Sequence, residues 1–176
     1  MGQLIRLPLP LPAYPDGAAE LDPAECVLLF AIRRWLADHR CSIDPLPRLC
    51  QALDIAGAHD AAFSVDRMMT VIGGTLRRPV VIHCPECSHV SDDEKILLHA
   101  ASLAQAGDAQ RAEKALRTAL LSAQGAEFAL GSFESLGELF TAAHLRLRRR
   151  SPPPPADVAA QIIEPWFAVG SSETTP

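Results

Sequence analysis

Apolar residues recur at intervals of three and four positions through the middle of the chain, the period that places them on one face of an α-helix. The first such stripe follows Asp22 and consists of Leu28, Leu29, Ile32, Trp35 and Leu36. A second consists of Ala112, Ala115, Leu116, Ala119 and Leu120, and a third of Ala129, Phe133, Leu136, Phe140, Ala143 and Leu147. Each stripe needs an apolar partner, so the pattern predicts an all-α fold.

Polar residues mark where three of these helices begin. Asp22-Pro-Ala-Glu25 and Ser91-Asp-Asp-Glu94 each have a capping residue followed three positions later by glutamate, a pattern that satisfies the free amide groups of a first helical turn. Asp108 is a third capping residue. We therefore expect helices from Asp22 to about His39, from Ser91 to Ala106, and from Asp108 onward.

Three further helices complete the prediction. Two short ones cover about residues 45–56 and 59–72, with Gly73-Gly74 at the end of the second. A longer one follows Gly125 and runs into the arginines at 146–150. The sum is a single bundle of five or six antiparallel helices.

The prolines divide the chain into three parts. Ten of the fifteen lie outside residues 22–150, and proline is excluded from helix interiors. We expect a flexible, extended arm over residues 1–21, the helical bundle over 22–150, and a flexible linker and tail over 151–176.

The tail is unusually apolar for a chain terminus. Pro152 to Pro155 predict a stiff spacer, because consecutive prolines adopt an extended helix. Four large apolar side chains follow it and are candidate partner-binding residues: Ile162, Ile163, Trp166 and Phe167. We expect this segment to dock on another protein, on a second copy, or on the chain's own bundle.

Composition narrows the class of protein further. Apolar residues make up 48% of the chain and aromatics only 5%, so Ala and Leu must build the core, which favours helices. The net charge of -5 opposes a general nucleic-acid-coating role. No run approaches the ~20 apolar residues that span a bilayer, so we expect no membrane association. An odd set of five cysteines fits a reducing compartment, and we expect a cytoplasmic protein.

The segment LAQAGDAQRAEKALRTAL resembles the turn of one tetratricopeptide repeat. Gly107, Ala112, Leu116 and Ala119 occupy the positions where that repeat has its glycine and its small or apolar packing residues. No second copy follows at a period of about 34 residues. The resemblance implies a helical hairpin with similar packing and does not imply membership of the repeat family.

Cys84-Pro-Glu-Cys87 is the first candidate for chemistry. It follows Val80–His83, which we expect to be an extended connector because so short a run cannot form a sheet alone. The motif resembles the knuckle of a zinc ribbon, in which two thiolates bind Zn²⁺ at ~2.3 Å. Zinc is thus a candidate cofactor, with His89 or His83 as a third ligand.

The zinc interpretation lacks a fourth ligand along the sequence. Cys41 and Cys50 are candidates from elsewhere in the fold, and a second chain could supply its own pair, as in zinc-hook dimers. A thiol redox pair is the second interpretation, because the order of strand, Cys-x-x-Cys and helix resembles that of thioredoxin-like proteins. The third, which we favour, is a surface loop whose cysteines act as small apolar residues.

Four arginines at the expected end of the last helix form a candidate anion site: Arg146, Arg148, Arg149 and Arg150. Guanidinium groups there could bind phosphate, anionic lipid or an acidic partner. The simpler interpretation, which we favour, is that they complement the negative end of the helix dipole.

Sequence motifs favour a non-enzymatic interaction or regulatory protein of the adaptor type. The chain shows no phosphate-binding glycine loop, nucleophile elbow or His-Glu-x-x-His motif. A helix-turn-helix over residues 45–72 would present Asp60 and Asp66 to DNA phosphates, which opposes nucleic-acid binding. The alternatives are a metal- or thiol-responsive transcriptional regulator using Cys84 and Cys87, and a thiol redox protein.

Overall fold

The structure, a computed structural model, describes residues 10–153 and is all-helical over that range, as the sequence predicts. All four predicted partner-binding residues, Ile162, Ile163, Trp166 and Phe167, lie outside the described residues. The described elements are the 3₁₀-helix η1 (Ala18–Glu20) and six α-helices: α1 (Pro23–Arg40), α2 (Leu46–Ile55), α3 (Ala61–Thr75), α4 (Asp92–Gln105), α5 (Ala109–Ala119) and α6 (Ala123–Ala142). No helix among them is long and apolar enough to cross a membrane.

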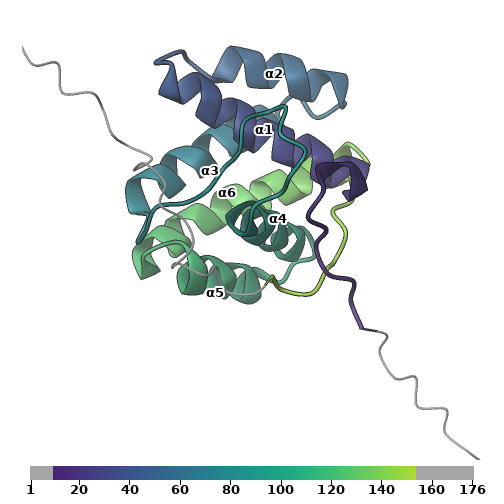
Figure 1. The fold of residues 1–176 in the computed structure, drawn as a ribbon, viewed down its shortest axis with the longest axis vertical. Helices are drawn as coiled ribbons and strands as arrows, with labels where there is room; N and C mark the ends of the chain where they lie inside the picture. The colour runs from purple at the N-terminus through teal and green to yellow at the C-terminus, as the bar shows by residue number, and fades with distance from the viewer. Residues whose placement is uncertain (1–9, 154–176) are drawn as a thin grey trace, which may run out of the picture.

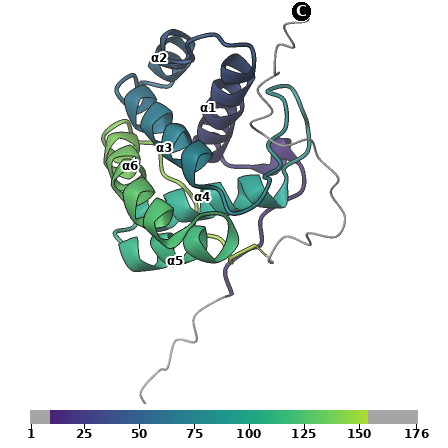
Figure 2. The same ribbon diagram turned by 90° about the vertical axis from the view of Figure 1, so that its left-hand side faces the viewer.

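The helices stack so that α2 lies at one end of the molecule and α5 at the other (Figures 1 and 2). Helices α3 and α6 are antiparallel neighbours in the middle, because Ser64 lies 3.0 Å from Ser135 while Ser122 donates to the Thr75 carbonyl oxygen at 3.0 Å. Helices α4 and α5 form a hairpin that packs against α6.

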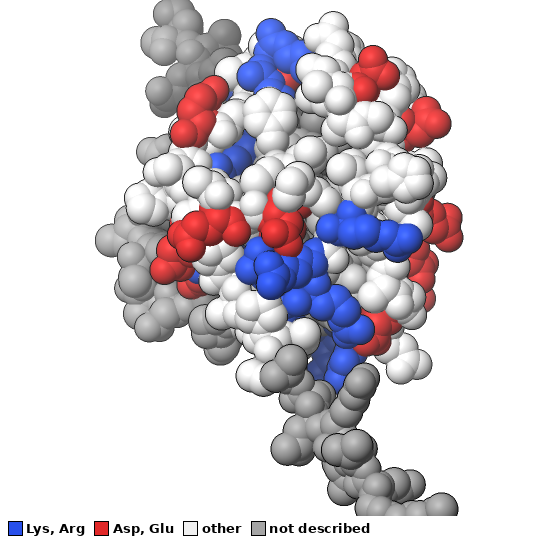
Figure 3. All heavy atoms as spheres, turned by 90° about the vertical axis from the view of Figure 1, so that its right-hand side faces the viewer, with Lys and Arg blue, Asp and Glu red and all other residues white. Residues whose placement is uncertain are grey.

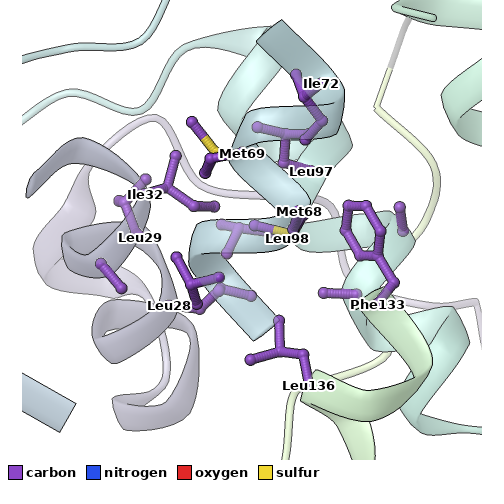
Figure 4. Packing of buried hydrophobic residues seen from close by; sticks show 14 of the residues in the cluster. Leu28, Leu29, Ile32, Met68, Met69, Ile72, Leu97, Leu98, Phe133 and Leu136 are labelled. Atoms are coloured by element: carbon purple, nitrogen blue, oxygen red, sulfur yellow. The ribbon is translucent and has the colours of Figure 1, made fainter. Parts of the chain in front are cut away.

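The core lies where α1, α3, α4 and α6 meet. Figure 4 shows Leu28 and Ile32 of α1 facing the side chains of the three other helices. Ten residues are labelled there, and all are at most 3% exposed: Leu28, Leu29, Ile32, Met68, Met69, Ile72, Leu97, Leu98, Phe133 and Leu136. Burying such side chains contributes about 1.5–3 kcal/mol each, so this cluster fixes the relative positions of the four helices.

The helix starts predicted at Asp22 and Ser91 are confirmed, whereas the last helix begins at Ala123 and not after Gly125, because the Ser122 hydroxyl accepts from the Gly125 amide at 3.0 Å. Glu25 accepts a hydrogen bond from the Asp22 amide at 2.9 Å, and α1 begins at the next residue. Ser91 accepts from the Glu94 amide at 3.1 Å while Glu94 accepts from the Ser91 amide at 2.8 Å, which is a reciprocal capping box.

Two predicted helix ends are wrong. Helix α3 continues through Gly73-Gly74 to Thr75, because neither glycine adopts a positive φ and the Thr75 hydroxyl donates to the Val71 carbonyl oxygen at 2.7 Å. Helix α6 ends at Ala142, well before the arginines, because His144 adopts a left-handed φ of 58° that a helix cannot include.

Residues 145–150 run in an extended conformation back along α4. Gln105 of α4 holds this segment, since its side chain donates to the Leu145 carbonyl oxygen and accepts from the Leu147 amide, both at 2.8 Å. Leu147, the last residue of the third apolar stripe, is buried as predicted, but it lies in an extended segment and not in a helix. The alternation of leucine and arginine here is typical of a half-buried extended chain.

The described part of the expected N-terminal arm packs on the bundle. Tyr14 and Leu21 belong to the core. The Asp16 carbonyl oxygen accepts from the Val90 amide at 2.8 Å, and the Ala18 amide donates to the Ser88 carbonyl oxygen at 2.7 Å. Residues 10–21 are therefore fixed to the connector that precedes α4.

Candidate anion-binding site

A cavity with a volume of about 830 Å³ lies along the α4–α5 hairpin. Helices α4 and α5 form two of its walls, and the chain segments around Arg77 and Arg149 form the others. A cavity of this size accommodates a small organic ligand, for which pockets of about 300–1,000 Å³ are usual.

Cationic side chains dominate the polar part of this wall. They come from three separate segments and are Arg77, Arg78, Arg111, Lys114, Arg149 and Arg150. No Asp or Glu belongs to the lining. Figure 3 shows Lys and Arg side chains gathered on one face of the molecule, with Asp and Glu side chains around them. The cavity therefore has the charge of an anion site.

Two of the arginines are held firmly by buried carboxylates. Arg150 donates twice to Glu25, both at 2.7 Å, and once to the Ala13 carbonyl oxygen at 3.1 Å. Arg78 donates to Asp93 at 2.5 Å and to the Ala119 carbonyl oxygen at 3.0 Å. These bidentate pairs position the wall and leave little charge for a ligand.

The other four cations have weaker partners. Arg111 and Arg149 share Asp108, at 3.5 and 3.8 Å. Arg77 donates to the Arg117 carbonyl oxygen at 3.2 Å, and among the described residues neither Arg77 nor Lys114 has a carboxylate partner. The cavity thus carries six positive charges against the three carboxylates Glu25, Asp93 and Asp108.

A buried histidine lines the cavity as well. His99 of α4 is 8% exposed, and its Nδ1 has no hydrogen-bond partner among the described residues. The hydroxyl of Tyr14 is also without one, and the two rings are 6.1 Å apart. Burial lowers the pKa of His99, and Arg149 and Arg111 lower it further. A buried polar atom without a hydrogen bond destabilises the fold, so a ligand or water that hydrogen-bonded to His99 Nδ1 or to the Tyr14 hydroxyl would stabilise the protein.

Apart from Ser102 and Thr118, the rest of the wall is apolar. Ile96 and Leu103 come from α4, and Ala115 from α5. Leu11 and Pro153 complete it from the two ends of the described chain. These ends are joined to each other, since the Ser151 amide donates to the Pro12 carbonyl oxygen at 2.9 Å.

The four arginines expected at 146–150 fall into two groups. Arg149 and Arg150 line the cavity, as described above. Arg146 is exposed, and Arg148 lies 3.8 Å from Asp22. Because α6 ends at Ala142, none of them complements the end of that helix.

The Cys84–Cys87 loop is a tight turn fixed from beneath by Arg33. The Cys87 amide donates to the Cys84 carbonyl oxygen at 3.1 Å. Arg33 of α1 donates to the carbonyl oxygens of Cys87 and His89 at 2.6 and 2.5 Å, and its guanidinium pairs with Glu94 at 2.7 Å. Arg33 and Glu94 are 2% and 0% exposed, so this ion pair is part of the core.

Residues 10–153 contain no group of three or more His, Cys, Asp or Glu side chains arranged to hold a metal ion. His83, next to Cys84, is half-buried, whereas Cys84 and His89 are exposed. Cys41 follows α1 and Cys50 lies in α2, and neither is brought to the loop as a ligand. The described residues therefore fit a four-coordinate zinc site poorly, and zinc at this loop stays a prediction.

Sequence reasoning missed most of the cavity. Arg77, Arg111, Lys114 and His99 lie in segments that are distant in sequence, and each is unremarkable by itself. One signal was present: Arg111 and Lys114 are three residues apart and so share a face of α5.

Comparison with protein-family models, with curated proteins and with solved structures found no match for this chain. The fold and the site together define a small all-helical protein with a basic, partly apolar cavity beside its two chain ends.

Proposed function

We propose that this chain is a regulatory binding module of the adaptor type, whose cavity along α4 and α5 takes an anionic ligand. The observation that carries the proposal is the lining: six cationic side chains, no acidic one, and the buried His99. Charge-assisted hydrogen bonds to guanidinium groups are among the strong ones in proteins.

The position of the cavity supports a regulatory role. Leu11 and Pro153 lie at the two ends of the described chain, and both line the cavity. A bound ligand would contact both segments that connect the bundle to the remainder of the sequence. Ligand binding can thereby change how those segments are presented to a protein partner.

The test is calorimetric titration with tripolyphosphate, a compact polyanion, at low ionic strength. The variant Arg111→Gln/Lys114→Gln removes two cations from the cavity, and we expect affinity at least about tenfold weaker, because hydrogen bonds to charged groups contribute ~1.5–3 kcal/mol. The matched control is Arg40→Gln/Arg67→Gln, which removes the same charge from exposed positions of α1 and α3.

If both double variants weakened the affinity for tripolyphosphate equally, binding would depend on the overall charge of the protein and not on the cavity, which would contradict the proposal. Absence of any heat of binding to the unmodified chain would contradict it more directly.

A further inference from the structure

The cations of the cavity are gathered toward the two ends of α5. Arg77 and Arg78 donate to the carbonyl oxygens of Arg117 and Ala119, which places them at the C-terminal end of the helix. Arg111 and Arg149 lie within 3.8 Å of Asp108, the residue that precedes its first turn.

The length of α5 sets the separation of the two ends. Eight residues lead from Arg111 to Ala119, and an α-helix rises about 1.5 Å per residue, so the ends are about 12 Å apart. The wall between them carries the apolar side chains Ile96 and Ala115, together with the polar His99, Ser102 and Thr118. Lys114 is the one cation in between, and its long side chain can reach toward either end.

Each end has charge that its own carboxylates do not balance. At one end Arg78 is paired with Asp93, whereas Arg77 has no carboxylate partner among the described residues. At the other end Asp108 serves both Arg111 and Arg149 at long distances, 3.5 and 3.8 Å. A compact anion would neutralise one end and leave the other unpaired.

We propose that the cavity takes an elongated ligand with an anionic group at each end, one group bound by Arg77 and the other by Arg111 and Arg149. This inference rests on the proposed function and specifies its ligand class. A nucleic-acid strand fits less well, because the lining contains no Phe, Tyr or Trp on which bases could stack.

The test is a series of alkane bisphosphonates whose two anionic groups are about 6, 12 and 18 Å apart when extended, chosen around the separation that the helix rise gives. The control ligand is an alkyl monophosphonate as long as the middle member. We expect the middle bisphosphonate to bind at least about tenfold more tightly than the monophosphonate and than the shortest member, because only it reaches both ends.

Three single variants locate the two contacts. Arg77→Gln and Arg111→Gln should each reduce the affinity for the middle bisphosphonate to that of the monophosphonate. Arg117→Gln is the matched control, because its side chain lies on the same helix outside the cavity lining, and it should leave the affinity unchanged. Thermal melting of each variant shows that it is folded.

Equal affinity for all three spacings, or an effect of Arg111→Gln without one of Arg77→Gln, would overturn the two-ended ligand. If tripolyphosphate still bound in the cavity, the proposed anion site would stand and only the two-ended ligand would be rejected. If neither ligand class bound, both proposals would fail.

Discussion

Arg33 and Glu94 form the most deeply buried ion pair of the described chain, and together they hold the connector before α4. Glu94 accepts from the His83 amide at 3.0 Å as well as from Arg33, so one carboxylate fixes a helix start and a loop together. Breaking such a pair from one side is costly, because the remaining charge is left buried without compensation.

We therefore expect Glu94→Gln to lower the free energy of unfolding by about 3–5 kcal/mol. Urea denaturation measures it. Arg48→Gln is the control, because Arg48 is 50% exposed and Asp38 keeps its second partner Arg34, so the loss should stay below ~1 kcal/mol. Similar losses in the two variants would show that Arg33 and Glu94 are not coupled as the geometry indicates.

His99 makes the stability of the fold depend on pH. Its pKa is lowered in the folded state, mainly by burial, from the ordinary value of 6.5. Between the folded pKa and 6.5 the unfolded chain binds the proton and the folded chain does not, so the free energy of unfolding falls as the pH drops through this window.

The variant His99→Gln should flatten that part of the profile, measured by urea denaturation at a series of pH values. His59→Gln, at an exposed position, is the control and should keep the profile of the unmodified chain. An identical pH dependence with and without His99 would contradict the environment described for it.

At the scale of the elements, Gly137 lets α6 approach α4. A β-carbon at this position would lie 2.7 Å from the Gln105 Cα, closer than any such contact tolerates, whereas one at Gly131 would meet nothing within 4 Å. Gly137 therefore supports the contact that places Gln105, and through it the extended segment that carries Arg149.

The two glycines give a matched pair of variants. Gly131→Ala should raise the free energy of unfolding by up to ~1 kcal/mol, because alanine favours a helix. Gly137→Ala should lower the free energy of unfolding by about 1–3 kcal/mol, because the added methyl group forces α4 and α6 apart, and this cost exceeds the gain in helix propensity. Thermal or urea unfolding measures both changes, and stabilisation by Gly137→Ala would contradict the packing of α4 against α6.

The helices could be predicted because their signals are local. The cap at Ser91 and the apolar stripe from Leu28 to Leu36 each act within a few residues. The ends of α3 and α6 could not be predicted in this way. The end of α3 depends on its packing against α6, and the end of α6 depends on the backbone conformation of His144. The path of residues 145–150 likewise depends on Gln105, forty residues earlier in the chain.

At the scale of the whole molecule, a chain with a net charge of -5 concentrates positive charge in one cavity. Sequence reasoning identified Arg149 and Arg150, since neighbouring arginines are visible as a run. It could not find Arg77 or Lys114, because only the α4–α5 hairpin and the returning chain end bring them to the same wall. The exposed Cys84–Cys87 turn, in contrast, was recognisable from sequence while its support by Arg33 was not.

Anion binding in this cavity should also be sensitive to salt. Arg111 and Lys114 are exposed, and dissolved salt weakens the attraction between exposed charges over a distance of about 8 Å at physiological ionic strength. The affinity for tripolyphosphate should thus fall as sodium chloride is added in the calorimetric titration. An affinity independent of salt would contradict binding by these charges.

The most direct measurement is the pKa of His99, followed by nuclear magnetic resonance with and without tripolyphosphate. His99 lies inside the cavity, and Arg149 and Arg111 contribute to its lowered pKa. A bound anion offsets these charges, so saturating tripolyphosphate should raise the pKa of His99. An unchanged His99 pKa under conditions where calorimetry shows saturation would place the anion elsewhere and contradict the account.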